Sequence, residues 1–140
     1  MEHKVAIITG AARGIGLATT KRLIEEGWRV AMVDRDTDEL QKASQDLNDA
    51  LALGYDISIP EQVTHMLNDT LSNFGRVDAL VNNAGVADFG PLEETSFEAW
   101  RTIMETNLDG AFLVSQAAIP ALKETKGSIE TGKIADFVIL

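Results

Sequence analysis

Two hydrophobic patterns alternate along the chain. Short apolar runs typical of buried strands are VAIIT (5–9), RVAMVD (29–34), ALALGYD (50–56) and DALVNNAG (78–85). Amphipathic stretches with helical spacing follow them at residues 15–27, 37–48, 60–74 and 97–123. Repeated strand–helix alternation predicts an α/β fold, in which a parallel sheet with right-handed crossovers is covered by helices on both faces.

Local end signals support these helices. Gly27 and Gly75 follow the first and third of them, and glycine readily adopts the left-handed conformation that ends a helix. Asp36 or Thr37 can cap the second helix, because a short oxygen-bearing side chain accepts a bond from the first turn.

Composition changes the picture in a few ways. The 140 residues suit one domain, and 45% of them are apolar, which is enough for a core. No apolar run is long enough to span a membrane, and a strand-like run follows the charged Glu2, His3 and Lys4, so we expect no secretory signal. The chain has no cysteine, which excludes disulfides and thiolate metal ligands, and His3 and His65 lack ligand spacing. We therefore expect a cytoplasmic protein without a metal site.

Net charge narrows the choice of partners. The formal charge is -10, and the lysines and arginines are few and scattered. A nucleic-acid or anionic-membrane surface needs clustered cations. The sequence therefore predicts neither nucleic acid nor membrane as a partner.

A glycine-rich segment, TGAARGIG (9–16), directly follows the first predicted strand and begins a helix. Gly10 permits a tight turn, Gly14 lets the backbone approach a pyrophosphate, and Gly16 brings the helix close to the strand. The free N–H groups at the start of that helix then face an anion. This context predicts a dinucleotide site, whereas an unliganded glycine-rich turn is the simpler alternative.

An acid ends the second predicted strand. Asp34 can accept hydrogen bonds from both ribose hydroxyls of NAD, and it would repel the 2′-phosphate of NADP. Arg13 and Arg35 could instead hold that phosphate. We expect NAD as the cofactor, with NADP as the less favoured alternative.

The segment TGAARGIG resembles the TGxxxGxG motif of the short-chain dehydrogenase/reductase family, and further motifs follow in order up to about residue 129. Asp56 in YDIS matches the family's aspartate beside adenine, NNAG (82–85) matches its fourth-strand motif, and Asn107 matches its tetrad asparagine. The resemblance implies a Rossmann-like doubly wound sheet with strand order 3-2-1-4-5. It also implies that the cofactor contacts Thr9, Gly10, Arg13, Gly14, Ile15, Gly16, Asp34, Arg35, Asp56, Ile57, Asn83, Ala84 and Gly85.

Structural roles compete with functional ones for the asparagines. Asn82 and Asn83 end a buried strand, where their amides can bond exposed backbone groups. Asn107 lies in an apolar helical stretch, so we expect it to be buried and to bond a backbone carbonyl or water. Without its tetrad partners, its catalytic role would be vestigial.

The resemblance stops at GSIETGKI (127–134). Ile134 stands where the family places its catalytic serine, and the family's tyrosine and lysine have no counterpart in the sequence. The one tyrosine, Tyr55, ends the third predicted strand, where a structural role is expected. Reduction of a carbonyl needs a proton donor at the developing alkoxide.

The last residues have a second resemblance. GSIETGKIADFVIL (127–140) resembles a terminal segment of metal-dependent amidohydrolases, which suggests a chimera or a truncation. We expect a dinucleotide-binding domain at 1–126 and an atypical tail at 127–140 that adds a non-standard fifth strand beside the fourth. The alternatives for the tail are a hairpin or pairing with another copy.

The fourth helical stretch is apolar around much of its circumference. It carries Trp100, Ile103, Met104, Phe112, Leu113, Ala117 and Ala118. We expect a homodimer through this helix or through the tail strand, and the alternative is that these residues are simply core.

Three functions stay open at this stage. The first is an NAD(H)-binding fragment of a short-chain dehydrogenase/reductase with little or no turnover. The second is an active NAD(P)-dependent oxidoreductase completed by a partner chain. The third is a chimeric or truncated folding variant without a physiological ligand.

Overall fold

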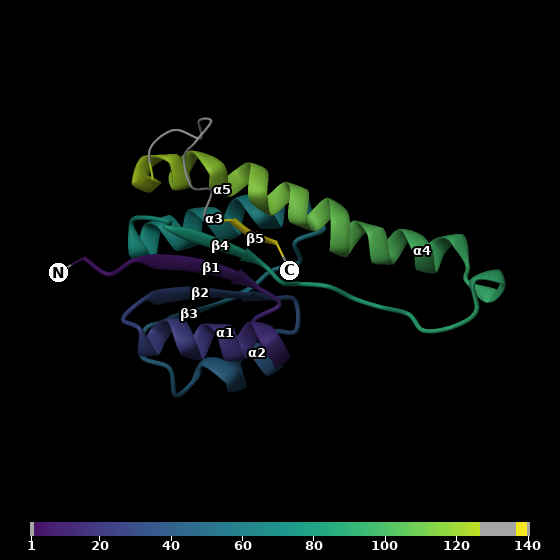
Figure 1. The fold of residues 1–140 in the computed structure, drawn as a ribbon, viewed down its shortest axis with the longest axis horizontal. Helices are drawn as coiled ribbons and strands as arrows, with labels where there is room; N and C mark the ends of the chain where they lie inside the picture. Colours follow the sequence, from purple (N-terminus) through teal and green to yellow (C-terminus); the bar gives the residue numbers. More distant parts are fainter. Residues whose placement is uncertain (1, 127–136, 140) are drawn as a thin grey trace.

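The computed structural model describes residues 2–126 and 137–139. Its centre is a parallel sheet of β1 (Val5–Thr9), β2 (Arg29–Asp34), β3 (Ala50–Gly54) and β4 (Ala79–Asn82), in the order β3-β2-β1-β4 (Figure 1). Ile7 lies in register with Ala31 on one side and Leu80 on the other. The predicted α/β class, the Rossmann-like parallel sheet and the order of these four strands are confirmed.

A three-residue strand, β5 (Phe137–Ile139), is parallel to β4, with Val81 opposite Val138. Residues 127–136 and 140, which make up the rest of the expected tail, lie outside the described residues. The expected role of the tail as a substitute fifth strand therefore stays a prediction.

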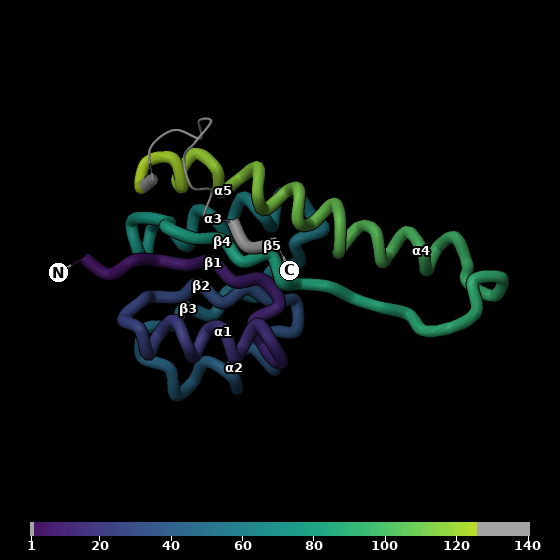
Figure 2. The backbone as a smooth tube through the Cα atoms, in the orientation of Figure 1, coloured from purple at the N-terminus to yellow at the C-terminus, as the bar shows by residue number. Residues whose placement is uncertain are grey.

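Helices cover both faces of the sheet. α1 (Gly14–Glu25) and α2 (Thr37–Ser44) lie on one face, while α3 (Pro60–Phe74) and α5 (Gly110–Lys126) lie on the other (Figure 1). A 3₁₀ turn, η1 (Leu92–Glu94), precedes α4 (Phe97–Met104). As the tube in Figure 2 shows, the chain after β4 runs out beyond the sheet and returns through α4 and α5. Within the described residues, no helix is both long and apolar enough to cross a bilayer.

The predicted end signals are present. Asp36 is the N-cap of α2 and accepts a bond from the Glu39 N–H at 3.2 Å. Gly75 ends α3 with a φ of 76°, in the left-handed region.

Several predicted boundaries were wrong for identifiable reasons. The expected strand 78–85 ends at Asn82, because the next two backbone N–H groups bond the Thr9 hydroxyl instead of a neighbouring strand. The expected strand 50–56 ends at Gly54, where Tyr55 N turns back to Leu53 O. The expected helix 97–123 is interrupted by a π-helical turn, η2 (Glu105–Asp109).

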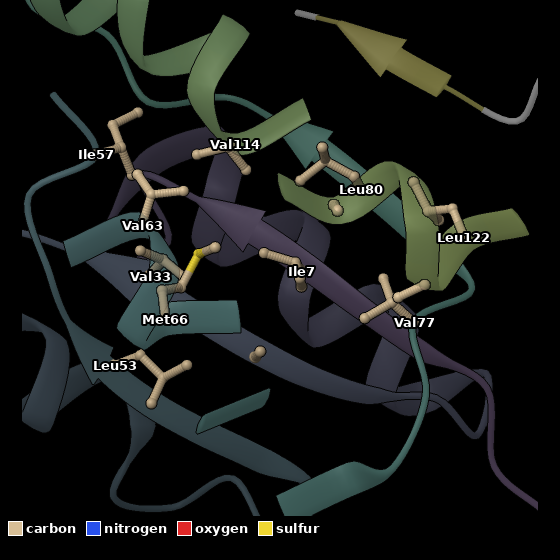
Figure 3. Close-up of a cluster of buried hydrophobic side chains, with 13 residues drawn as sticks. Ile7, Val33, Leu53, Ile57, Val63, Met66, Val77, Leu80, Val114 and Leu122 are labelled. Atoms are coloured by element: carbon tan, nitrogen blue, oxygen red, sulfur yellow. The ribbon is translucent and has the colours of Figure 1, made fainter. Parts of the chain in front are cut away.

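Alternate residues of the strands fill two separate cores. Ile7, Val33 and Leu80 point towards α3 and α5, where they join a cluster that includes Met66 and Leu122 (Figure 3). The residues between them point the other way, towards α1 and α2; they are Ile8, Val30, Met32 and Val81, with Leu40 from α2. Burial on both sides explains why the strands are continuously apolar.

Part of the fourth apolar stretch belongs to the core. Val114, Ala118, Ala121 and Leu122 of α5 are buried against the sheet. Trp100 and Phe112 are instead exposed by 47% and 62%. The core alternative therefore holds for these four residues and not for Trp100 and Phe112, while the expected homodimer stays a prediction.

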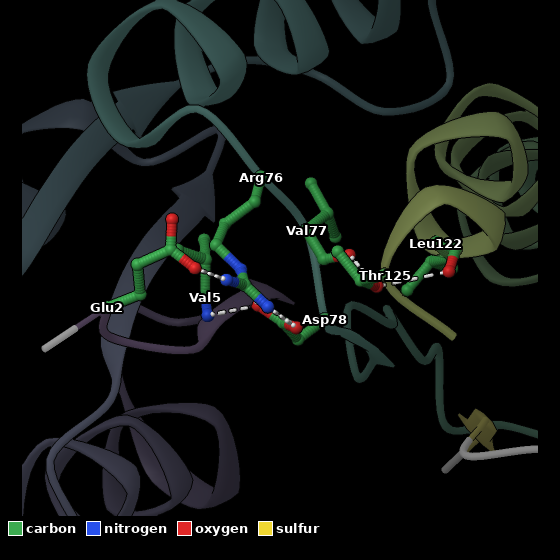
Figure 4. Close-up of polar contacts among 7 residues, drawn as sticks. All are labelled: Glu2, Val5, Arg76, Val77, Asp78, Leu122 and Thr125. Atoms are coloured by element: carbon green, nitrogen blue, oxygen red, sulfur yellow. Dashed lines mark hydrogen bonds and ion pairs between the residues drawn. The ribbon is translucent and has the colours of Figure 1, made fainter. Parts of the chain in front are cut away.

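A charged cluster ties the amino end of β1 to the segment before β4. Buried Asp78 accepts a bond from the Val5 N–H at 2.9 Å and forms a two-pronged pair with the Arg76 guanidinium (Figure 4). Exposed Glu2 pairs with the same guanidinium. Nearby, the Thr125 hydroxyl donates to Val77 O at 2.8 Å, which links α5 to this segment (Figure 4).

Asp78→Ala should lower the free energy of unfolding by about 2 kcal/mol, because the buried Val5 N–H loses a charged acceptor. Urea unfolding followed by circular dichroism measures the change. Glu2→Ala is the matched control, since it removes the exposed partner of the same guanidinium and should leave stability nearly unchanged. Equal losses in the two variants would contradict this assignment.

Candidate functional site

The carboxyl ends of β1 and β4 are joined by one hydroxyl and one amide. The Thr9 hydroxyl accepts bonds from the backbone N–H groups of Asn83 and Ala84, both at 3.0 Å. The Asn83 side chain donates to Thr9 O and Gly10 O, both at 3.1 Å. The glycine-rich loop and the NNAG segment, 74 residues apart in sequence, therefore form one rigid edge.

At two positions of this loop only glycine fits, because other backbone atoms lie where a Cβ would be. Gly10 has a φ of 64°, and a Cβ there would lie 2.9 Å from the Ala84 Cα. A Cβ on Gly16 would lie 2.2 Å from the Gly10 carbonyl oxygen, so any side chain would push α1 away from the loop. Beside Gly14, which has a φ of 58°, the space is open. These positions match the roles expected for a turn, a close packing contact and an approachable backbone.

A cleft opens at the carboxyl edge of the sheet, beside this loop. Nine predicted residues line it: Gly10, Arg13, Asp34, Arg35, Asp56, Ile57, Asn83, Ala84 and Gly85. Four predicted residues do not: Thr9 is buried at the end of β1, Gly16 is buried in the first turn of α1, and Gly14 and Ile15 are exposed at the start of α1.

Sequence reasoning missed five lining residues, namely Val33, Asp36, Tyr55, Val86 and Thr106. Asp36 was considered only as a helix cap, although its position two residues after Asp34 at the end of β2 was a usable signal. Thr106 comes from the π-helical turn, and no sequence pattern indicated that turn.

The Asp34 carboxylate organises the mouth of the cleft. One oxygen accepts the Ala12 N–H at 3.1 Å and the other accepts the Asp36 N–H at 3.0 Å. The carboxylate is thereby fixed between the glycine-rich loop and the start of α2. Each oxygen can still accept a further hydrogen bond.

Arg13 and Asp36 form an ion pair beside Asp34. The bond to Arg13, with a second bond from the Glu39 N–H, lowers the pKa of the Asp36 carboxyl. The same bond raises the pKa of Arg13, and the nearby charges of Asp34 and Glu39 act in the same direction. Arg35 lines the same part of the cleft and is exposed.

Asp56 is held by its own turn. Its Oδ1 accepts bonds from the Ser58 N–H at 2.9 Å and the Ser58 hydroxyl at 2.7 Å. Its backbone N–H donates to Gln62 Oε1 at 2.7 Å. These bonds fix the start of α3 and place Asp56 and Ile57 along one wall of the cleft.

Asn107 is exposed, which corrects the expectation that it is buried. Its Oδ1 accepts the Val86 N–H at 2.7 Å, and its Nδ2 donates to Val86 O at 2.8 Å. The expected bond to a backbone carbonyl is present, and the π-helical turn carries the side chain that makes it. Asn107 thus holds the backbone beside Gly85 without lining the cleft.

Tyr55 lines the cleft next to Asp56, and its hydroxyl is already used. It donates to the Asp69 carboxylate of α3, and the ring stacks on His65 with a centroid distance of 6.4 Å. The bond to Asp69 and partial burial raise the pKa of Tyr55 above 10.0.

In the described part of the chain, no group of acidic side chains and histidines is arranged to hold a metal ion.

A parallel α/β sheet with a glycine-rich loop and an acid at one edge defines a protein of the Rossmann type. A model of the short chain dehydrogenase family matches residues 4–132. The chain therefore belongs to the short-chain dehydrogenase/reductase family of oxidoreductases.

Individual relatives agree with this assignment. The chain is 37% identical to L-fucose dehydrogenase of Oryctolagus cuniculus over 127 residues, which cover 90% of this chain and 45% of the relative. It is 38% identical to meso-2,3-butanediol dehydrogenase of Serratia marcescens over 130 residues, 91% of this chain and 52% of the relative. A 3-ketoacyl-(acyl-carrier-protein) reductase from Brucella melitensis, complexed with NADH, superposes with a TM-score of 0.86 at 37% identity, covering 89% of this chain and 52% of that one.

The chain spans about half the length of the curated relatives it matches. The family match continues to residue 132, past Gly127 where the amidohydrolase-like segment begins. These comparisons do not support the amidohydrolase resemblance.

The single tyrosine makes the Tyr55–Asp69 bond measurable. The Tyr55 hydroxyl donates to Asp69 only while it is protonated, and the folded protein raises its pKa. The bond therefore contributes its full stabilisation to the folded state below pH 10.0, and this stabilisation is lost as the pH rises through the raised pKa. Absorbance at the tyrosinate band should show ionisation above pH 10.0 in the native protein, and Asp69→Asn should move the midpoint down towards that value. Asp46→Asn, an exposed acid elsewhere, serves as the control, and an unchanged midpoint in Asp69→Asn would contradict the bond.

Proposed function

We propose that residues 4–126 form an NAD(H)-binding unit of a short-chain oxidoreductase. One observation carries the proposal: the glycine-rich loop, through Gly10 and Arg13, lines one cleft with the fixed Asp34 carboxylate, and the open Gly14 backbone follows at the start of α1. The first can receive a pyrophosphate and the second a ribose, which are the two parts that a dinucleotide presents at such an edge.

The residues present suit such a cofactor. Arg13, the N-cap of α1, makes no side-chain cap bond, so the first turn of α1 keeps its N–H groups for an anion. Asp34 would accept ribose hydroxyls, while Asp56 and Ile57 would border the adenine. Ala84, whose N–H donates to the Thr9 hydroxyl, and Gly85, which precedes the Val86 backbone bonded by Asn107, would border the other half of the molecule. When bound, a nicotinamide cofactor supplies the hydride chemistry.

NAD is proposed over NADP because the ribose end of the cleft is rich in carboxylates. Asp34 and Asp36 line it, and Glu39 adds its charge nearby. A 2′-phosphate would bring like charge to this group. The NADH bound to the similar Brucella melitensis reductase is consistent with this preference.

We propose little or no hydride transfer by these 140 residues alone. A catalytic phenol must give up its proton readily, and the one tyrosine has its pKa raised by the carboxylate to which it donates. Activity would then depend on groups from another chain or segment. Carbonyl reduction by the purified 140-residue protein would contradict this part of the proposal.

For the tail, we propose that β5 closes the free edge of β4 as a fifth parallel strand. The register of Leu80 with Phe137 and of Asn82 with Ile139 supports this placement. An uncovered edge strand would offer its backbone groups to other chains.

For the partner, we propose a second copy of the chain on an apolar strip formed by Phe97, Trp100, Leu108 and Phe112. Their exposed fractions are 75%, 47%, 64% and 62%. They come from the consecutive elements α4, η2 and α5, in which Val114 and Ala118 are buried against the sheet. Large apolar side chains gathered in this way commonly mark an interface.

NADH binding tests the main proposal. Tryptophan fluorescence or calorimetry should detect saturable binding, and Asp34→Asn should weaken it about tenfold, because a charged acceptor of ribose hydroxyls is lost. Asp46→Asn controls for the loss of one negative charge away from the cleft. Absence of binding at millimolar NADH would overturn the proposal.

Light scattering tests the interface. The native protein should be a dimer at micromolar concentration, and a Leu108→Asp, Phe112→Asp variant should be a monomer, because burial of the new charges is costly. Ile59→Asp makes a similar change at the start of α3 and should leave the dimer intact. A monomeric native protein would exclude the interface.

A further inference from the structure

The Arg13–Asp36 ion pair joins two elements across the mouth of the cleft. Arg13 belongs to the glycine-rich loop and Asp36 to the start of α2, and both line the cleft next to Asp34. The pair is exposed to solvent, with side-chain fractions of 62% and 43%. Pairs this exposed add little to stability, so its position invites a functional explanation.

Asp36 is the fixed member of the pair. One carboxylate oxygen accepts the Glu39 N–H at 3.2 Å, and the other accepts from Arg13. Its backbone N–H donates to Asp34 Oδ1 at 3.0 Å. Among the described residues, Asp36 is the one hydrogen-bond partner of the Arg13 guanidinium, so the carboxylate determines where the arginine lies.

We propose that Asp36 sets the preference between NAD and NADP by holding Arg13 in this ion pair. The inference rests on the proposed dinucleotide function and adds a specificity-determining residue to it. Asp36 is a positioning residue here, because it acts on the ligand through Arg13.

The charges explain the direction of the effect. Arg13 and Arg35 are the cations lining the cleft that a 2′-phosphate beside Asp34 could recruit, and of the two Arg13 is the one paired with Asp36. A guanidinium binds phosphate well through paired N–H groups. With Asp36 bound to Arg13, a phosphate must compete for the guanidinium and also meets the carboxylates of Asp34 and Asp36. A ribose with free hydroxyls meets neither obstacle. Removal of the Asp36 charge should therefore favour NADP and leave NAD nearly unaffected.

The experiment compares dissociation constants for NADH and NADPH, measured by calorimetry on the full chain at low salt. Asp36→Asn is the first variant, since asparagine preserves the N-cap of α2. We expect NADPH to bind about three- to tenfold more tightly and NADH to change by less than about twofold. Asp38→Asn removes one charge from the same helical turn outside the cleft, and it should change neither constant appreciably.

A second arm tests whether Arg13 carries the effect. In an Arg13→Gln background, the gain in NADPH affinity from Asp36→Asn should disappear. The same gain in both backgrounds would mean that the negative charge of Asp36 repels the 2′-phosphate directly and not through Arg13, which would overturn the inference.

The remaining outcomes separate the two proposals. If the native protein binds NADH and Asp36→Asn leaves NADPH affinity unchanged, this inference fails and the proposed function stands. If neither dinucleotide binds any variant, the proposed function fails and this inference fails with it. Should Asp36→Asn melt at a much lower temperature than the native protein, Asp36→Ser, which also caps helices, must give the same NADPH gain.

Discussion

The hydrogen bonds of the Thr9 hydroxyl hold together the two loops on which the candidate site depends. The hydroxyl receives two backbone N–H groups from the end of β4, while the Asn83 amide returns two bonds to the end of β1. In a parallel sheet, the carboxyl ends of neighbouring strands lie at one edge and the connecting loops diverge from it. These bonds instead bring the two loops together and leave the cleft between them and the end of β2.

The close contacts of the glycines follow from that junction. With the Gly10 backbone against Ala84 and the Gly10 carbonyl against Gly16, there is no volume for side chains at either glycine. The start of α1 is thereby placed near the β4 loop. The cleft beside this helix start is lined by residues that follow β1, β2, β3 and β4.

Much of the fold could be predicted because its signals are local. Buried strands must be apolar on both sides, so β1 and β2 are visible as continuous runs, and both of their predicted ends are confirmed. Asp36 and Gly75 act on their own helices, and each was identified as an end signal. The strand ends of β3 and β4 were placed too late, since distant or returning hydrogen bonds, rather than a change in hydropathy, end them.

The sequence by itself determined the α/β alternation, the glycine spacing, the acid that ends β2 and the acid that follows β3. Only the tertiary structure decided that Asn107 holds the Val86 backbone, that Arg13 pairs with Asp36, and that Ile15 lies outside the cleft. Periodicity and helix caps depend on neighbours within a few residues. The Asn107–Val86 and Arg13–Asp36 bonds instead join residues 21 and 23 positions apart in the sequence. Whether such residues meet depends on how whole helices and strands pack against one another.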